Sequence, residues 1–135
     1  MTSKVTYLGG LRTSNEHLKS GNTYITDAPV DNHGKGEAFS PTDTVATGLA
    51  NCMLTVMGIK ATQMEVNLIG TWAAVTKTMS SDMPRRIVAI KVLINFPKGI
   101  DQKSRKILEH TANTCPVHYS LHPEINKEII FNWME

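Results

Sequence analysis

No stretch of this 135-residue sequence approaches the run of roughly 20 apolar residues that spans a bilayer. The N-terminal segment also lacks the continuous apolar core of a secretory signal, because charged and polar residues interrupt it throughout. We therefore expect a cytoplasmic protein with no membrane segment.

The sequence has no large excess of positive or negative charge. The 14 Lys and Arg residues face 12 Asp and Glu residues, and the resulting net charge of +2 is spread along the chain without a basic run. Nucleic acid is therefore not an expected partner. The length fits a single domain over residues 1–135, and a chain of this size buries about two-thirds of its unfolded surface without help from a metal or a disulfide.

Cysteine is scarce, with only Cys52 and Cys115 present. Three histidines stand near the second cysteine: His110, His118 and His122. There is no Cys-x-x-Cys or His-Glu-x-x-His pair, so a structural zinc site is not expected. The glycines at 34 and 36 do not form a phosphate-binding or dinucleotide pattern, so no cofactor is predicted. In the cytosol such cysteines are reduced, redox-active or inert more often than permanently bridged.

The first third of the sequence contains three strand-like pieces separated by turn residues. These are Val5–Leu8, Leu11–Leu18 and Asn22–Thr26, with glycine pairs or Ser-Gly between them. They predict a short antiparallel meander. The segment Asp27–Phe39 has no periodicity of either kind, which indicates an exposed loop.

A helix start is predicted at Ser40, which is followed by Pro41 at the first helical position and by Asp43 three residues after the cap. Apolar residues then recur every three or four positions as far as Ile59, on two stripes. A helix that is apolar on nearly every side is expected to be a buried central helix. Its small residues would allow close approach of another helix or of a partner subunit: Thr47, Gly48, Ala50 and Asn51.

The second half predicts two strands, Asn67–Thr78 and Arg85–Phe96, joined as a hairpin. Asp101 is expected to cap a further helix, whose apolar face runs to Cys115 and stops at a break before Pro116. An alternating strand, Lys127–Met134, closes the chain. The predicted order is β-β-β-α-β-β-α-β, an α+β fold.

The residues alone leave the chemistry of the cysteines open. Either thiol, placed on an apolar helix face, can be a small buried hydrophobe. Cys52 can also act as the nucleophile of a hydrolase with His110 or His118, because such partners meet only in the fold.

Two motifs carry a family resemblance. Ser40–Asp43 followed by Ala50–Met53 resembles the first cysteine motif of the OsmC/Ohr family, the osmotically inducible and organic hydroperoxide resistance proteins. Thr114–Val117, with its Cys-Pro step, resembles the second cysteine motif of that family. Together with the spacing of the cysteines and the order of elements, the resemblance covers nearly the whole chain.

This resemblance implies an OsmC-like fold, with two antiparallel sheets packed around a central helix in an intertwined homodimer. It also implies an active site at the subunit interface, with Cys52 as the peroxidatic and Cys115 as the resolving cysteine. The implied substrate is an organic hydroperoxide, which would enter an apolar pocket lined partly by Met53 and Met57. A cellular thiol or a lipoyl group would reduce the resulting disulfide.

The sequence departs from the family pattern at the residues that activate the thiolate. The family glutamate ten residues before the first cysteine is replaced by Thr42, with Asp43 beside it. We expect Arg12, or failing that Lys35, to supply the cation, and Asp43 to orient it. The departure also keeps a second hypothesis open, an OsmC-like redox or ligand-binding protein with weak or no peroxidase activity.

Overall fold

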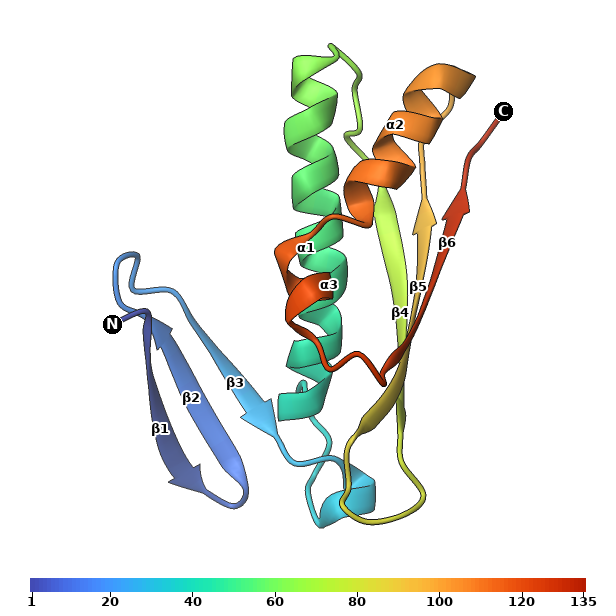
Figure 1. Ribbon diagram of the computed structural model, residues 1–135. Helices are drawn as coiled ribbons and strands as arrows, with labels where there is room; N and C mark the ends of the chain where they lie inside the picture. Colours follow the sequence, from blue (N-terminus) through green and yellow to red (C-terminus); the bar gives the residue numbers. More distant parts are fainter. The chain divides into compact units, whose positions relative to one another are not determined.

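The computed structural model describes residues 1–135, and its internal contacts divide the chain into two compact units, Met1–Val45 and Ala46–Glu135. Three strands precede the long helix α1, and the chain continues through β4, β5, α2, α3 and β6 (Figure 1). This confirms the predicted α+β order and adds two short helices, a 3-10 turn at Val30–Asn32 and α3. That residues 1–135 act as one domain stays a prediction.

The first unit contains the predicted antiparallel meander, in the order β1-β2-β3. Its strands are β1 (Ser3–Gly9), β2 (Arg12–His17) and β3 (Thr23–Asp27). Gly9 and Gly10 form the first turn with φ of 81° and 61°, a region that glycine enters without steric cost. The register places Arg12 directly opposite Asp27 at one end of the sheet.

The segment after β3 is exposed for most of its length, as predicted, but it is folded back on itself. The amide of Gly34 donates to the carbonyl of Pro29 at 2.9 Å, and the amide of Gly36 donates to the carbonyl of Ala28 at 3.1 Å. A Cβ on Gly34 would stand only 1.7 Å from the Ala28 oxygen, so the backbone approach requires glycine there. The segment also begins at Asp27, which is buried.

Helix α1 (Pro41–Gln63) begins where the sequence predicts. The amide of Asp43 donates to Ser40 Oγ at 3.0 Å, and the amide of Ser40 donates to the Asp43 carboxylate at 2.9 Å. These two bonds form a capping box, which satisfies backbone donors that the helix itself leaves unpaired.

The expectation that α1 is buried on nearly every side is wrong for this chain. Its buried residues lie on one face: Ala46, Leu49, Ala50, Met53, Met57 and Ala61. Val45 is 44% exposed and Ile59 is 58% exposed. Met53 and Met57 are completely buried in the core, so neither lines an open pocket as the family resemblance suggests.

The expectation that no segment is apolar enough to cross a membrane also needs correction. By length and composition alone the 23-residue helix α1 meets that criterion, because Asp43 and Lys60 are its only charged residues. A core helix can meet the same criterion, so the finding does not identify a membrane span.

The second unit contains a mixed sheet in the order β4-β5-β6, not the antiparallel sheet that the family resemblance suggests. Strands β4 (Trp72–Met79) and β5 (Ile87–Asn95) form the predicted antiparallel hairpin, but β6 (Asn126–Asn132) runs parallel to β5. Between β5 and β6 the chain passes through α2 (Gln102–Ala112) and α3 (Pro116–Ser120). A crossover of this length allows the parallel return.

Strand β4 starts five residues later than predicted, at position 72 instead of 67. The Asn67 carboxamide oxygen accepts the amide of Ile69 at 2.9 Å, and the hydroxyl of Thr71 donates to the carbonyl of Leu68 at 2.7 Å. These local bonds compete with strand pairing, so the β-rich composition forms a turn here instead.

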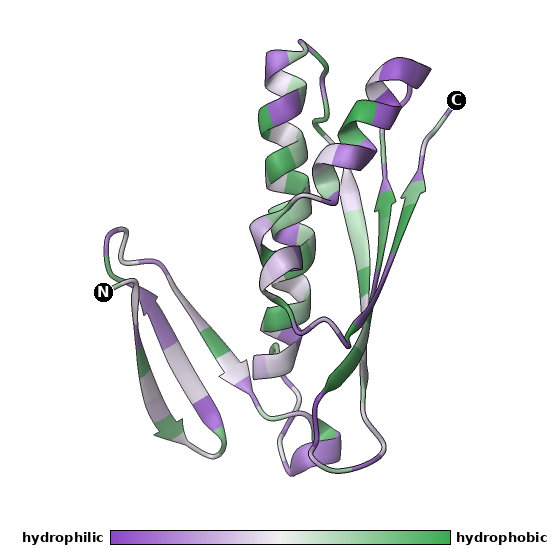
Figure 2. Cartoon of the chain, in the orientation of Figure 1, coloured by the Kyte–Doolittle hydropathy of each residue, from purple (hydrophilic) through white to green (hydrophobic).

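The core of the second unit lies between its helices and its sheet. Ile90, Val92 and Ile94 of β5 are fully buried, as their predicted alternation requires, together with Leu108 and Ala112 of α2. Figure 2 shows hydrophobic residues along β5 and β6, with α1 and α2 on one side of these strands. Helix α2 begins at the predicted cap, since the Asp101 carboxylate accepts the amide of Ser104 at 2.9 Å.

Candidate functional site

The two cysteines come from different elements of the second unit. Cys52 lies on α1 at the edge of the buried face and is half-buried. Cys115 is completely buried and is the N-cap residue of α3. The predicted break before Pro116 is confirmed, but Cys115 does not lie on the face of α2, because that helix already ends at Ala112.

The N-cap position gives Cys115 a backbone partner. The amide of His118 donates to Cys115 Sγ at 3.2 Å, within the range of a hydrogen bond to sulfur. The role that serine or aspartate usually has at a helix start is therefore taken here by a thiol. Cys115 lies in the short segment between α2 and α3, and its side chain packs in the hydrophobic core and not in solvent.

The fold brings the two predicted site cysteines together, because Cys52 lies near enough to affect the titration of Cys115. Burial raises the pKa of the Cys115 thiol above its ordinary value, and the neighbouring Cys52 raises it further, while the His118 amide opposes the shift. Burial disfavours the thiolate, so Cys115 keeps its proton near neutral pH. Of the two, Cys52 is also the one that solvent or a substrate reaches.

The predicted cation, Arg12, has a partner that sequence analysis missed. Its Nε donates to Asp27 Oδ1 at 2.7 Å and its Nη2 donates to Asp27 Oδ2 at 2.8 Å. The Glu37 carboxylate lies 3.6 Å from Nη2. The Arg12 guanidinium lowers the pKa of the Asp27 carboxyl, and the same hydrogen bonds raise the pKa of Arg12. Both groups are therefore charged near neutral pH.

Asp43 does not occupy the place that we expected beside Arg12. Its carboxylate accepts the amide of Ser40 in the capping box, so we replace Asp43 with Asp27 as the acid that orients Arg12. Thr42 shares a hydrogen bond with Ser40 between their hydroxyls, at 3.2 Å. Arg12 belongs to the first unit and Cys52 to the second, so the proximity of Arg12 or Lys35 to Cys52 stays a prediction.

Asp27 and Glu37 were not identified from the sequence, although one signal pointed to Asp27. It directly follows the predicted strand Asn22–Thr26, where a charged residue can meet another across a hairpin. The register that pairs it with Arg12 depends on the length of the turn between β2 and β3. Glu37 reaches Arg12 only because the glycine-rich segment folds back.

The histidines do not form a metal site with the cysteines. Among residues 1–135 no group of three or more His, Cys, Asp or Glu side chains is placed to hold an ion. His118 contributes its backbone amide to Cys115, and its ring packs edge-on against Tyr119 at 5.9 Å between centroids.

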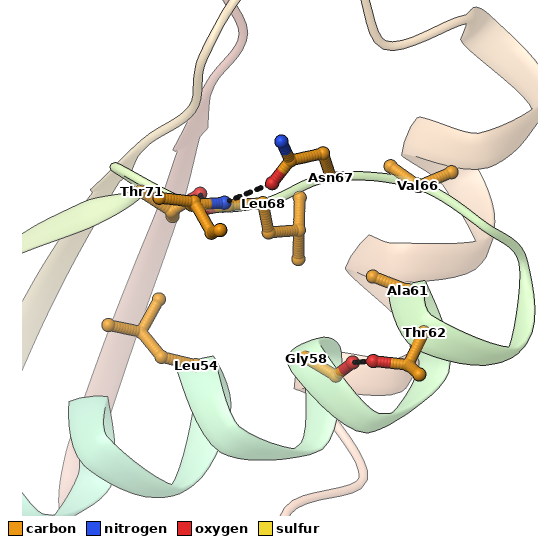
Figure 3. Close-up of a pocket in the computed structure, with 9 residues that line it drawn as sticks. Leu54, Gly58, Ala61, Thr62, Val66, Asn67, Leu68 and Thr71 are labelled. Atoms are coloured by element: carbon orange, nitrogen blue, oxygen red, sulfur yellow. Dashed lines mark hydrogen bonds between the residues drawn. The ribbon is translucent and has the colours of Figure 1, made fainter.

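An open groove of about 400 Å³ lies elsewhere in the second unit, between the C-terminal half of α1 and the turn before β4 (Figure 3). Leu54, Gly58 and Ala61 line it on the helix, and Val66 and Leu68 face them from the turn. Successive helix residues are rotated by about 100°, so Leu54 points away from the side of α1 that carries Cys52. The groove is therefore separate from the thiol pair.

Comparison with known proteins decides the family. Residues 34–129 match the family of OsmC-like proteins. The chain belongs to the OsmC-like family. A search of curated proteins found no match.

Solved structures of OsmC-like proteins share this fold. A candidate osmotic stress induced and detoxification response protein from Psychrobacter arcticus is 57% identical, with a TM-score of 0.93 over 98% of this chain and 96% of the other. An organic hydroperoxide resistance protein from Legionella pneumophila is 16% identical, with a TM-score of 0.76 over 98% and 97% of the two chains.

A candidate organic hydroperoxide resistance protein from Vibrio cholerae, solved with captopril in one of its active sites, is also 16% identical. Its TM-score is 0.74 over 98% of this chain and 92% of the other. At this identity the Legionella and Vibrio structures establish the fold. The names of these neighbours refer to osmotic stress, detoxification or resistance to organic hydroperoxides.

Proposed function

We propose that this OsmC-like protein is a thiol-dependent peroxidase that reduces organic hydroperoxides, with Cys52 as the attacking residue and Cys115 as the resolving residue. The observation that supports the proposal is a pair of neighbouring thiols, of which Cys52 is partly exposed and Cys115 is buried and protonated. Neither cysteine alone would favour this function over an inert core position.

The first step consumes the peroxide. The Cys52 thiolate attacks one oxygen of the O–O bond, a sulfur–oxygen bond forms, and the O–O bond breaks. The alkoxide that leaves takes up one proton and departs as the alcohol. Cys52 is oxidised to a sulfenic acid, and the hydroperoxide is reduced by two electrons.

The second step protects Cys52 from irreversible oxidation. The Cys115 sulfur attacks the sulfenic sulfur, the disulfide forms, and hydroxide leaves with the Cys115 proton as water. The two cysteines are neighbours in the fold before the reaction. An external reductant, either two molecules of a small thiol or one reduced lipoyl group, then reduces the disulfide by thiol exchange and is itself oxidised to a disulfide.

One feature of the surroundings favours an organic hydroperoxide over hydrogen peroxide. Cys52 packs against the hydrophobic core cluster, so the site offers apolar contacts to an alkyl chain. Arg12 is the proposed cation that stabilises the thiolate, and its guanidinium donates two hydrogen bonds to Asp27. A thiolate in apolar surroundings requires such a cation, because burial by itself favours the thiol.

The decisive assay mixes the reduced protein with cumene hydroperoxide or with hydrogen peroxide and follows thiol loss and dithiol-dependent turnover. We expect turnover with cumene hydroperoxide and a markedly slower reaction with hydrogen peroxide. Persistence of both thiols in the presence of either peroxide would contradict the proposed function.

A second function, an OsmC-like redox or ligand-binding protein with little peroxidase activity, is favoured by one observation. Thr42 occupies the position of the family glutamate and cannot pair with an arginine by charge. The Arg12–Asp27 pair weakens this argument, since another acid engages the arginine. In the same assay, this second function predicts thiols that persist with peroxides but react with a small electrophile such as iodoacetamide.

We also propose that the protein is an obligate homodimer. The exposed side of α1 carries Val45 and Ile59. In the first sheet more than half of the surface of each of three apolar or aromatic residues is exposed: Val5, Tyr7 and Tyr24. Such apolar surface is typical of an interface between subunits. Sedimentation at micromolar concentration is expected to give twice the mass of one chain, about 30 kDa from 14.9 kDa. A persistent monomer would contradict the proposal.

A further inference from the structure

Helix α1 contains two glycines inside its length, Gly48 and Gly58. Glycine inside a helix is less favourable than alanine, because it loses more conformational freedom on folding. A Cβ added to either residue would meet no atom within 4 Å, and neither residue has a positive φ. Packing within the chain and backbone conformation therefore do not explain glycine at these positions.

Gly48 lies one helical turn before Cys52. Residues four apart are neighbours on a helix surface, and a helical side chain leans back over the turn that precedes it. The Cys52 side chain therefore lies over the turn that contains Gly48 and Leu49. Leu49 is completely buried, whereas Gly48 is only partly buried. The space beside the Cys52 side chain is thus filled on the side of Leu49 and open on the side of Gly48.

We propose that Gly48 is a specificity-determining residue, whose missing side chain leaves room beside the Cys52 sulfur for a hydroperoxide with a bulky organic group. This inference rests on the proposed function, in which Cys52 attacks the peroxide. The resolving thiol of Cys115 is completely buried, so it approaches Cys52 from the core and leaves the side of Gly48 to the substrate.

The two classes of peroxide differ in the room that they need. The organic group of a hydroperoxide extends beyond its two oxygens, whereas hydrogen peroxide carries nothing there except a hydrogen atom. A methyl group at position 48 would not touch the sulfur, since it would have no neighbour within 4 Å, but it would occupy part of the open space. The added methyl group is therefore expected to hinder the organic substrate selectively.

Gly58 provides a matched control on the same helix. It lies six residues after Cys52 on a face rotated by about 120°, and it lines the separate groove shown in Figure 3. Like Gly48 it is partly buried and has open space where a Cβ would stand. Alanine is the residue most favourable to a helix, so both Gly48→Ala and Gly58→Ala should fold.

The test measures peroxide loss by stopped flow in the unsubstituted protein and in the two alanine variants. We expect Gly48→Ala to slow the reaction with cumene hydroperoxide about tenfold or more, the usual effect of one methyl group in an apolar site. The rate with hydrogen peroxide should change little, and Gly58→Ala should change neither rate. Equal slowing of both peroxides, equal slowing by both variants, or no slowing would overturn the proposal.

A second readout does not depend on peroxidase activity. In a Cys115→Ser background, Cys52 is alkylated with iodoacetamide, which is small, or with N-phenylmaleimide, which is bulky. Gly48→Ala should slow only the bulky reagent. That result in a protein that does not turn over cumene hydroperoxide would support the role of Gly48 in access and contradict the peroxidase.

The remaining outcomes count against Gly48 alone. Turnover of cumene hydroperoxide without selective slowing by Gly48→Ala in either readout would overturn the inference and leave the proposed function intact. Sedimentation gives a further check. A lower mass for Gly48→Ala than for the unsubstituted protein would assign Gly48 to a contact between two copies of the chain and would also overturn the inference.

Discussion

Replacing Cys52 with serine should abolish peroxide consumption, whereas replacing Cys115 with serine should allow one fast turnover that then stops. The asymmetry follows from burial: Cys52 is half-exposed, and Cys115 is completely buried and keeps its proton. Without Cys115 the sulfenic acid on Cys52 has no internal thiol to meet and proceeds to more oxidised forms. Stopped-flow measurement of cumene hydroperoxide loss, followed by mass spectrometry, distinguishes the two variants.

The same chemistry predicts that peroxide joins Cys52 to Cys115 within one subunit. A disulfide requires Cα atoms within about 7 Å, and the two cysteines are neighbours in one unit of the chain. The apolar helix around Cys52 predicts from the sequence that its thiol is the more enclosed of the two. The structure shows the reverse, and the greater accessibility of Cys52 supports the same roles. Two free thiols after peroxide treatment, or a bridge between subunits only, would contradict this mechanism.

Replacing Phe96 with alanine should lower the free energy of unfolding by about 3–5 kcal/mol, the range for truncation of a large buried aromatic residue. Phe96 is 1% exposed, and its ring stacks on Trp133 at 3.6 Å and on Phe131 at 6.3 Å between centroids. The substitution would leave a cavity beside the rings of Phe131 and Trp133. Urea denaturation at a fixed protein concentration measures the loss.

Phe39 provides a matched control for this prediction. The same truncation there removes a ring that is 55% exposed, so most of its surface is already in contact with water in the folded chain. Phe39→Ala should change the free energy of unfolding by clearly less than Phe96→Ala. Equal losses in the two variants would show that the aromatic stack around Trp133 is not a main contribution to the stability of the core.

The proposed chemistry draws on two arrangements that are held by local hydrogen bonds. At the cap of α3 the amide of His118 donates to the Cys115 sulfur. At the end of the first sheet the Asp27 carboxylate accepts two hydrogen bonds from Arg12.

The sequence by itself determined the features that depend on neighbours along the chain. Ser40, Pro41 and Asp43 predict the start of α1, because a capping box involves residues three positions apart. Asp101 predicts the start of α2 for the same reason, and Pro116 marks the break beside Cys115. The two cysteine motifs sufficed to predict the family, which the match over residues 34–129 confirms.

Only the tertiary structure decided which distant residues meet. Asp27 faces Arg12 through the register of β2 and β3, which depends on the turn between them and cannot be read from either residue alone. The direction of β6 depends on how α2 and α3 pack before the chain returns, and alternating residues are compatible with both directions. The apolar periodicity extends the predicted helix as far as Cys115, but α2 ends three residues earlier, at Ala112. Cys115 is therefore buried from a position outside that helix. Each of these outcomes is set by competition between non-local contacts, whose energies depend on the whole packed unit instead of a sequence window.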